Sequence, residues 1–302
     1  MVAANDLFAF TSDNAPLLPL NFPPVGNSAR ARHIKSPRYI NYDVGSAVLN
    51  RLNWLYDHPK VCRPPCTLIY SDTNNGKSYL AKKFVRDHEA VDDSPEYGKH
   101  PVLFVDSPPG ADLNGFYDAI LRSLNAPYKS SARSPAKWDQ LLQLLKAVGT
   151  KVLILDEVNN YLYGKVDQRS LILNSMKCLS NELQIPVVAV GTPDSVRVFQ
   201  TDQQLGNRFE PMGIPRWKVS KEYALFISRF VSCLDLKHES DFHSKELVGR
   251  IHTMAEGLTG ETCKLLERAA ELAVEMNREV IDMTTLDNVQ WVMPSERRRA
   301  AR

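Results

Sequence analysis

The sequence lacks any apolar run long enough to cross a membrane, and its N-terminus lacks a basic stretch followed by an apolar core. We therefore expect neither a membrane span nor a secretion signal. The 302 residues contain only five cysteines, and this number is odd. Cys62, Cys66 and nearby His58 lack the fourth ligand and the second ligand cluster that a structural zinc site normally has. Reduced thiols in a cytoplasmic protein are therefore the expected state.

Excess charge of either sign is also missing, because the formal net charge is only +2. Any nucleic-acid surface must then be a local patch. One segment, residues 119–138, contains no acidic residue but carries hydroxyl side chains and four cations, Arg122, Lys129, Arg133 and Lys137. A basic, hydroxyl-rich segment suits contact with a phosphate backbone. A solvated loop explains the same composition equally well.

The stretch that organises the chain is Ser71-Asp72-Thr73-Asn74-Asn75-Gly76-Lys77-Ser78. It follows a short apolar run that predicts a buried strand, and it precedes a segment that predicts a helix from Tyr79 onward. This strand, loop and helix order is typical of a phosphate-binding loop, in which backbone N–H groups face the phosphates of a nucleotide. Lys77 would reach the β- and γ-phosphates, and the Ser78 hydroxyl would bind Mg²⁺. The residues predicted to bind the nucleotide are Asp72, Thr73, Asn74, Asn75, Gly76, Lys77, Ser78 and Tyr79.

A second apolar run, Val152-Leu153-Ile154-Leu155, ends in Asp156-Glu157. Acids at this point complete a nucleotide site, with Asp156 holding Mg²⁺ and Glu157 polarising the attacking water. A further buried strand ends at Thr192, which could touch the γ-phosphate or only cap the next helix. Arg208 precedes a short fifth strand and is a candidate arginine finger for a neighbouring subunit, with a surface ion pair to Glu210 as the alternative.

Strands alternate with helices as far as residue 216, which predicts an α/β fold with a parallel five-stranded sheet. Ligands of such sheets lie at the carboxyl ends of the strands. The chain then becomes wholly helical. The expected domains are an extended arm (1–36), an α/β nucleotide-binding domain (37–216) with a basic insertion near 111–138, a helical lid (217–293) and a basic tail (294–302). The basic end of the arm, with Arg30, Arg32 and Lys35, is a second candidate contact for nucleic acid or a partner protein.

The phosphate loop, the Asp-Glu strand, the polar strand end, the arginine before the fifth strand and the helical lid together resemble an AAA+ ATPase. More specific segments resemble the TniB family of transposition regulators, which are related to TnsC and more distantly to MuB. These segments are Thr73-Asn74-Asn75-Gly76-Lys77-Ser78, Leu155-Asp156-Glu157-Val158-Asn159-Asn160, Asn181-Glu182-Leu183-Gln184-Ile185-Pro186, Val190-Gly191-Thr192 and Asn207-Arg208-Phe209-Glu210-Pro211.

This resemblance implies a bacterial, cytoplasmic ATPase that uses ATP and Mg²⁺ and assembles on double-stranded DNA as a homo-oligomeric ring or filament. It also implies two protein partners, a DDE-type transposase and a TniQ-like target-selection protein. By this resemblance, the residues that bind and hydrolyse the nucleotide in the family correspond here to Lys77, Ser78, Asp156, Glu157, Thr192 and Arg208. The basic segment lies where initiator-type AAA+ proteins carry an extra helical element facing DNA, so Lys129, Arg133 and Lys137 become the candidate DNA contacts.

Two positions depart from the AAA+ pattern. Ser71 replaces the first glycine of the phosphate loop, and Cys263 stands where many AAA+ lids carry a sensor arginine, with Lys264 as a weak substitute. Two other functions remain open, a helicase loader of the same superfamily and an ATP-gated DNA-binding scaffold that barely hydrolyses ATP. Glu157 argues against the scaffold, because a scaffold needs no water-polarising carboxylate.

Overall fold

The computed structural model describes residues 27–89, 98–201 and 203–300. By its internal contacts the chain divides into two compact units. An α/β unit comprises Asp43–Pro215, and a helical unit combines Arg216–Arg302 with the residues up to Tyr42. Among the described helices, none combines the length and the apolar character that crossing a bilayer requires.

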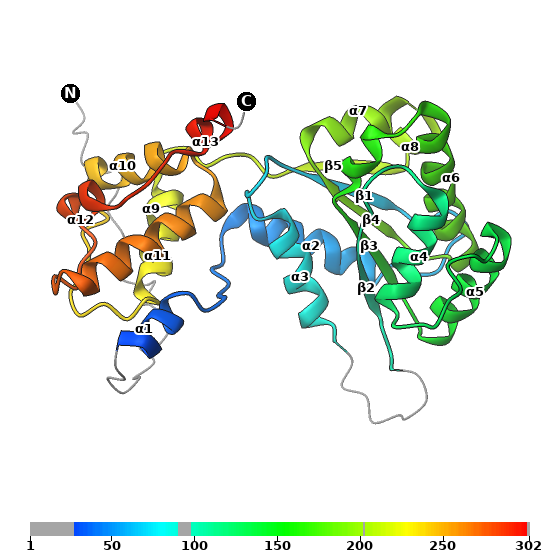
Figure 1. The fold of residues 1–302 in the computed structure, drawn as a ribbon, viewed down its shortest axis with the longest axis horizontal. Helices are drawn as coiled ribbons and strands as arrows, with labels where there is room; N and C mark the ends of the chain where they lie inside the picture. Colours follow the sequence, from blue (N-terminus) through cyan, green and yellow to red (C-terminus); the bar gives the residue numbers. More distant parts are fainter. Residues whose placement is uncertain (1–26, 90–97, 202, 301–302) are drawn as a thin grey trace. The chain divides into compact units, whose positions relative to one another are not determined.

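The α/β unit is built on one parallel sheet of five strands in the order β2-β3-β4-β1-β5 (Figure 1). The strands are β1 (Cys66–Tyr70), β2 (Val102–Asp106), β3 (Val152–Asp156), β4 (Val187–Gly191) and β5 (Phe209–Gly213). All four strand pairings are parallel. The predicted five-stranded parallel sheet is therefore confirmed.

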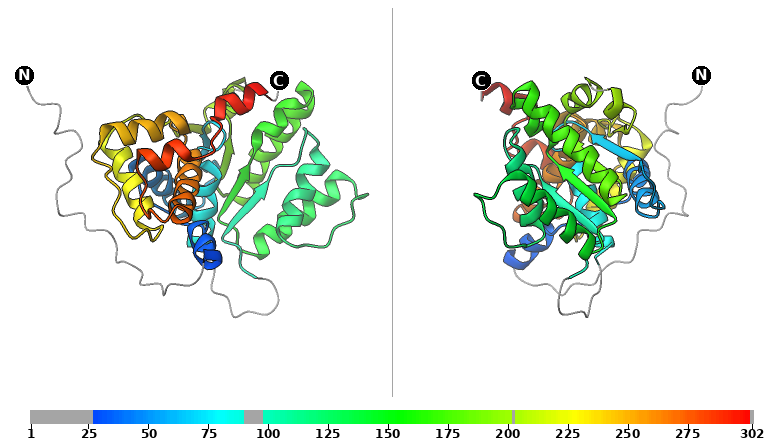
Figure 2. Two further views of the ribbon diagram at one scale, coloured as in Figure 1. Left: turned by 60° about the vertical axis from the view of Figure 1, so that its left-hand side comes forward. Right: turned by 90° about the vertical axis from the view of Figure 1, so that its right-hand side faces the viewer.

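Helices cover both faces of this sheet, with α2 and α3 on one face and α4, α5 and α6 on the other (Figures 1 and 2). The crossover from β1 to β2 runs across the sheet in the opposite direction to the crossovers from β2 to β3 and β4. Right-handed connections then require helices on opposite faces. The helical segments of this unit are α2 (Asp43–Tyr56), α3 (Lys77–Asp87), α4 (Leu113–Ser123), α5 (Ser134–Ala147), the 3₁₀ segment η2 (Val158–Tyr163), α6 (Val166–Leu183), α7 (Pro193–Thr201) and α8 (Gln203–Gly206).

Strand residues are buried on both faces of the sheet, which explains their uninterrupted apolar runs. Alternate residues, such as Leu153 and Leu155 of β3, join one buried cluster with Phe116 of α4 and Met176 of α6. The intervening Ile154 is fully buried as well, on the other face. Both faces of the sheet are therefore covered by apolar side chains, and polar functional residues can lie only at the edges where the strands begin and end.

Strand register brings the carboxyl ends of β1, β2, β3 and β4 together. Asp106 pairs with Asp156, Leu155 with Ala189, and Tyr70 with Gly191. The residues that follow β1, β3 and β4 therefore lie at one edge of the sheet. The phosphate loop, the two acids and Thr192 all follow these strands.

The helical unit packs around its longest helix, α11 (Thr259–Glu275), which contacts α1, α9, α10 and α12. Side-chain caps fix three of its helix starts, because Ser220, Ser244 and Asp282 each accept a hydrogen bond from a backbone N–H of the following first turn. The other helices are α1 (Asn27–Ile34), α9 (Lys221–Ser232), α10 (Lys245–Ala255), α12 (Met283–Asn288) and α13 (Pro294–Ala300).

The predicted extended arm is wrong for residues 27–34, which form α1 and pack on α11. Arg30 pairs with Glu279 and donates to the Asp235 carbonyl, and Lys35 Nζ lies 2.7 Å from Glu271. Arg30 is therefore held in the helical unit, whereas Lys35 forms a surface ion pair and its side chain stays 62% exposed. The remainder of the predicted arm, residues 1–26, lies outside the described residues.

The lid was predicted to be helical as far as residue 293, and this is wrong beyond Asn288, where α12 ends. Trp291 anchors the following segment instead, since its Nε1 donates to the Met254 carbonyl at 2.8 Å and its ring packs against the guanidinium groups of Arg268 and Arg297. The predicted tail also starts a helix, α13, whose Arg297 pairs with Glu261. Tertiary contacts therefore override the local helical pattern here.

Candidate nucleotide-binding site

The phosphate loop joins β1 to α3 through two residues in the left-handed region, Asn74 (φ 62°) and Gly76 (φ 89°). Gly76 is the better suited of the two, because glycine adopts this conformation without steric cost. Ser71 does not have a positive φ. Backbone geometry therefore does not require the first glycine of the usual pattern at this position. Of the other predicted loop residues, Thr73 is exposed, while Asp72 and Tyr79 are half-buried.

Two hydrogen-bonding residues fix this loop to the sheet. The Ser71 N–H donates to the Gly191 carbonyl at 3.2 Å. Asn75 is fully buried, and its Nδ2 donates to the carbonyls of Ile214 (3.0 Å) and Pro215 (3.1 Å). Asn75 is one of the predicted nucleotide-binding residues, and its side chain holds the loop in place.

Lys77, Ser78 and Asp156 meet at the carboxyl edge of the sheet. Lys77 is 4% exposed and Asp156 is 2% exposed, so both charges are removed from bulk water. Burial raises the pKa of Asp156, while a hydrogen bond from the Ser78 hydroxyl and the charge of Lys77 act in the opposite direction. A buried carboxylate beside a hydroxyl suits a hard cation such as Mg²⁺, which takes oxygen ligands.

The raised pKa of Asp156 predicts how the stability of the nucleotide-free protein depends on pH. Folding favours the protonated carboxyl, so the free energy of unfolding should fall as the pH rises from about 4, the ordinary carboxyl pKa, through the raised value. Asp156→Asn removes the ionisation and should be more stable than the wild type at pH 7. Thermal unfolding from pH 4 to pH 8 without nucleotide measures both curves. Parallel curves for the two proteins would contradict the prediction.

Glu157 follows Asp156 with a left-handed backbone (φ 54°, ψ 38°), which is unfavourable for a residue with a side chain. Its N–H donates to Asp156 Oδ1 at 2.9 Å, and its Oε2 accepts from Asn159 Nδ2 at 3.0 Å. The Asn159 Oδ1 atom is buried without a hydrogen-bond partner among the described residues. Sequence reasoning did not single out Asn159, although it lies two residues after the acid that it contacts.

Thr192 ends the neighbouring strand and is half-buried. The carbonyl of Thr192, rather than its hydroxyl, accepts the Ser195 N–H at 2.9 Å. Within the described part of the chain the Thr192 hydroxyl forms no hydrogen bond, so capping does not occupy it. The adjacent Gly191 must be glycine, because a Cβ there would lie 2.5 Å from Ser195 Oγ and 2.9 Å from Val158 Cγ2.

Arg208 lies at the opposite, amino edge of the sheet, immediately before β5. The alternative ion pair with Glu210 is wrong, because Glu210 pairs with Arg51 Nη2 at 2.6 Å. Arg208 Nη2 instead donates to two neutral groups of α6, Asn181 Oδ1 at 2.7 Å and Ser180 Oγ at 3.3 Å. Its charge therefore has no acidic partner within the described residues.

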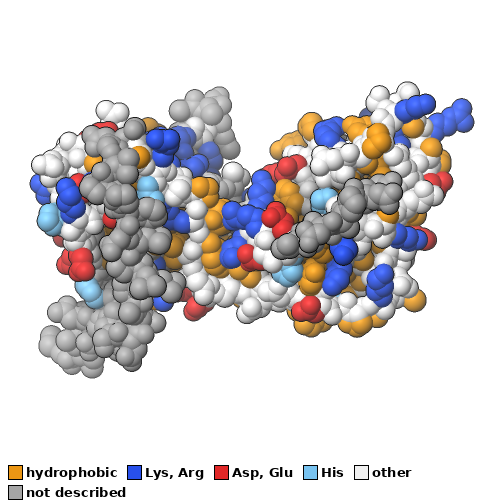
Figure 3. Space-filling view, turned by 90° about the horizontal axis from the view of Figure 1, so that it is seen from below, with side chains coloured by type: hydrophobic (Ala, Val, Ile, Leu, Met, Phe, Trp, Pro, Cys, Tyr) orange, Lys and Arg blue, Asp and Glu red, His pale blue; other side chains and the backbone are white. Residues whose placement is uncertain are grey.

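The basic segment spans α4, α5 and the turn between them, so two helices connect β2 to β3. Lys129 and Arg133 are exposed, as predicted for DNA contacts. Lys137 is a correction, because its side chain is 1% exposed and its Nζ pairs with Asp118 at 2.7 Å and donates to the Ser130 carbonyl at 3.0 Å. On the face shown in Figure 3, Lys and Arg side chains are interspersed with Asp and Glu. Any DNA surface on that face is therefore local.

The position of a lid sensor arginine is taken by Cys263 in α11 of the helical unit. Burial, together with the charge of Glu267, raises the pKa of this thiol to about 12, so it stays neutral at pH 7. A thiol is either neutral or negatively charged, so Cys263 cannot replace the positive charge of a sensor arginine. The neighbouring Lys264 is exposed.

Comparison with known structures shows the fold. The Aeropyrum pernix ORC1 protein, solved in complex with DNA, is 13% identical, with a TM-score of 0.64 over 86% of this chain and 68% of that chain. The Aeropyrum pernix ORC2 protein is 15% identical, with a TM-score of 0.59 over 85% and 71% of the two chains. The Thermotoga maritima RuvB Holliday junction branch migration motor is 14% identical, with a TM-score of 0.51 over 85% and 72%.

Sequence comparison gives the family. No curated protein sequence matches this chain. The family described as "Bacterial TniB protein" matches residues 30–219, which is more than half of the 302 residues. Together with the strand order and the AAA+ neighbours, this match shows that the chain is a member of the TniB family with an AAA+ fold.

Proposed function

We propose that this chain is an ATP-dependent, DNA-binding regulator of transposition that oligomerises on target DNA and recruits a transposase. The observation that carries the nucleotide part is the meeting of Lys77, Ser78 and Asp156 at one sheet edge, where two nearly buried charges lie beside a glycine-bearing loop. Lys77 would bind the β- and γ-phosphates, and Ser78 with Asp156 would hold Mg²⁺. The metal would neutralise phosphate charge, while the N-terminus of α3 supplies unpaired N–H groups.

Glu157 would accept the proton of the attacking water, and its hydrogen bond from Asn159 sets the direction of the carboxylate. Thr192, on the adjacent strand, has a hydroxyl available for the γ-phosphate or the water. A carboxylate placed directly after the proposed metal ligand Asp156 supports hydrolysis over a passive scaffold, because a scaffold needs no water-polarising group.

The DNA part of the proposal rests on the exposed pair Lys129 and Arg133 and on the TniB family match. The similar ORC1 protein was solved in complex with DNA, which supports the same assignment. Assembly on double-stranded DNA would present a DDE-type transposase and a TniQ-like target-selection protein with many equivalent sites. The family match also favours transposition over helicase loading.

The test is DNA binding by Lys129→Ala/Arg133→Ala at several salt concentrations, in the presence of a non-hydrolysable ATP analogue. Losing two phosphate contacts should reduce the steepness of the slope of log affinity against log salt by about 2 and weaken binding by about 10–100-fold near 0.1 M salt. Unrelated duplexes should be affected alike, since phosphate contacts carry no sequence information. Fluorescence anisotropy with labelled duplexes measures both quantities.

Lys137→Ala is the matched comparison within the same segment. Removing its ammonium leaves Asp118 without its ion-pair partner, so this variant should lose about 3 kcal/mol of stability, while the salt slope of the folded protein stays unchanged. Wild-type affinity and slope in the double variant would contradict the DNA assignment of Lys129 and Arg133. A reduced slope in Lys137→Ala would contradict its structural role.

A further inference from the structure

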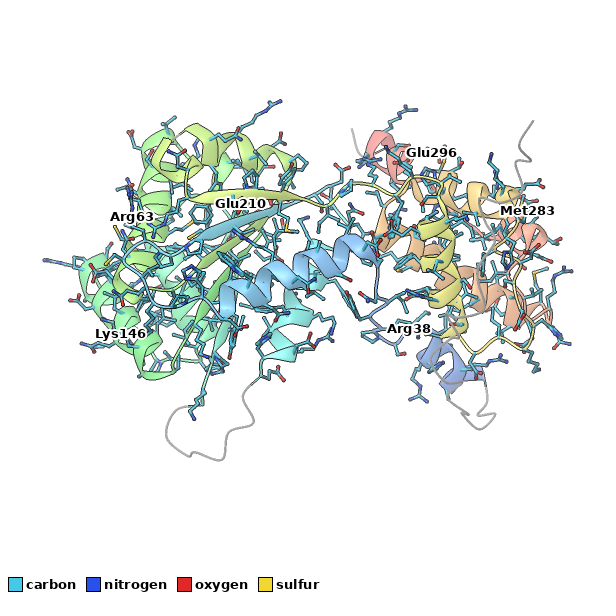
Figure 4. All side chains as sticks on the ribbon, turned by 180° about the vertical axis from the view of Figure 1, so that it is seen from behind. Arg38, Arg63, Lys146, Glu210, Met283 and Glu296 are labelled. Carbon is cyan, nitrogen blue, oxygen red and sulfur yellow. The ribbon has the colours of Figure 1, made fainter. Side chains whose placement is uncertain are left out.

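A pocket of about 670 Å³ opens at the amino edge of the sheet, beside the starts of β1 and β5. Its charged residues are Arg51, Arg63, Arg208 and Glu210, and three prolines form much of its wall (Figure 4 labels Arg63 and Glu210). A volume of this size falls within the roughly 300–1,000 Å³ of typical ligand pockets. The proposed nucleotide site of the same molecule is at the opposite edge, so the nucleotide bound there would not occupy this pocket.

The charges of this pocket are not balanced. Glu210 forms an ion pair with Arg51, whose Nη2 lies 2.6 Å from Glu210 Oε2. The Arg51 Nε donates to Thr67 Oγ1. Arg208 is bound only by neutral groups of α6. Burial raises the pKa of the Cys66 thiol, so this residue stays neutral and adds no negative charge.

Arg63 is the second cation without a counter-charge. It is exposed, and within the described residues its guanidinium forms no ion pair or hydrogen bond. Pro64, which follows it, limits the backbone conformations open to Arg63. Two guanidinium groups without an acidic partner lining one pocket suit a polyphosphate, because guanidinium binds phosphate oxygens in pairs.

The distance from the pocket to the phosphate loop shows whether the arginines can reach the nucleotide of their own chain. The five-residue strand β1 separates the pocket from the phosphate loop, and five residues at ~3.3 Å each span about 16 Å. Neither arginine can therefore reach the nucleotide of its own molecule.

We propose that Arg63 is a second arginine acting in trans, which binds the triphosphate held by a neighbouring copy of this chain alongside Arg208. This proposal rests on the proposed ATPase function. The pocket of one copy would face the nucleotide edge of the next, which is a head-to-tail interface and so builds rings or filaments. Occupation by phosphates removes the repulsion between the two guanidinium groups, so nucleotide would favour assembly.

The test compares Arg63→Ala with Lys146→Ala, a matched control that removes an exposed cation elsewhere on the same unit (Figure 4). We expect Arg63→Ala to keep the wild-type melting temperature and the ATP affinity of the unassembled chain, to lose at least tenfold in ATPase rate, and to assemble only at higher protein concentration. Lys146→Ala should match the wild type. The measurements are thermal unfolding, binding of a fluorescent ATP analogue, steady-state hydrolysis and light scattering.

Mixtures of two inactive variants show whether Arg63 acts on the nucleotide of a neighbouring copy. Arg63→Ala mixed with Lys77→Ala should regain activity, because some interfaces then pair an intact pocket with an intact loop. Arg63→Ala mixed with Arg208→Ala should regain none, because every pocket lacks one arginine. Rescue in the second mixture, or wild-type hydrolysis by Arg63→Ala alone, would overturn the proposal.

Binding of DNA phosphates by this pocket is the competing outcome. It predicts that Arg63→Ala weakens duplex binding without nucleotide and that mixing with Lys77→Ala restores no hydrolysis; this result would overturn the proposal. A separate measurement tests the proposed ATPase function. If Lys77→Ala alone binds ATP as tightly as the wild type, the assignment of the nucleotide site is wrong.

Discussion

Replacing Glu157 by Gln will leave ATP binding intact and slow hydrolysis by about 10²–10⁴-fold, the usual contribution of a general base. Gln keeps the size of the side chain and retains an oxygen that can accept from Asn159 Nδ2, now 3.0 Å from Glu157 Oε2. It cannot take a proton from water. The loss should therefore appear in the turnover number and not in the affinity for ATP.

The matched control is Glu182→Gln, the same chemical change at an exposed position of α6. Steady-state phosphate release and binding of a fluorescent ATP analogue give the rate and the affinity of each variant. We also expect Glu157→Gln to stay on duplex DNA longer than the wild type, because the ATP-bound state persists. Wild-type turnover in Glu157→Gln would remove this residue from the mechanism, and weakened ATP binding would assign it to holding the nucleotide.

The parallel sheet and the edge that carries the nucleotide site could be predicted because each strand is a short apolar run followed by polar residues. Leu153 to Leu155 are buried on both faces of the sheet, and this leaves a plain signal in the sequence. Asp156 is the last residue of β3, so it lies at the carboxyl edge of the sheet. No knowledge of distant partners is needed for either inference.

Lys137 shows where such reasoning fails. The acid-free segment suggested an exposed cation, but Asp118 lies just before that segment, on α4, and packing of α4 against α5 buries the pair. Arg30 fails for the same reason, because its partner Glu279 lies near the other end of the chain. Composition reports local charge, whereas the choice of ion-pair partner depends on tertiary packing.

The side chain of Asn75 has a role that the loop prediction did not include. Its amide holds the loop to the carbonyls that follow β5. Likewise the sequence left Arg208 and Glu210 as an alternative ion pair, since they are two residues apart. The structure pairs Glu210 with Arg51, a residue on α2 that sequence reasoning did not consider.

Arg208→Ala will lose most of the ATPase activity, since arginine fingers supplied in trans typically contribute on the order of 10³–10⁵ in rate. Arg208 lies at the amino edge of the sheet, about 16 Å of strand away from its own phosphate loop. Its contribution therefore needs a second copy of the chain. Wild-type activity should rise more steeply than linearly with protein concentration, and DNA should sharpen this rise by bringing copies together.

Release of Arg208 from α6 must accompany this role. In the single chain its Nη2 donates to Asn181 Oδ1 at 2.7 Å, and its Nε is buried without a hydrogen-bond partner among the described residues. Arg208→Lys keeps the charge but loses the planar, paired donors that match phosphate oxygens. We therefore expect Arg208→Lys to recover only a small part of the lost rate.

Mixing two inactive proteins gives the decisive measurement. Arg208→Ala keeps an intact phosphate loop, and Lys77→Ala keeps an intact finger, which it can offer to the next copy. In a random equimolar assembly with head-to-tail interfaces, about a quarter of the interfaces pair a working loop with a working finger. ATPase activity should therefore return to about a quarter of the wild-type value at saturating protein and DNA. Each variant alone should stay inactive at every concentration. If the mixture also stays inactive while activity of the wild type is strictly proportional to its concentration, Arg208 acts within its own chain and the trans mechanism is wrong.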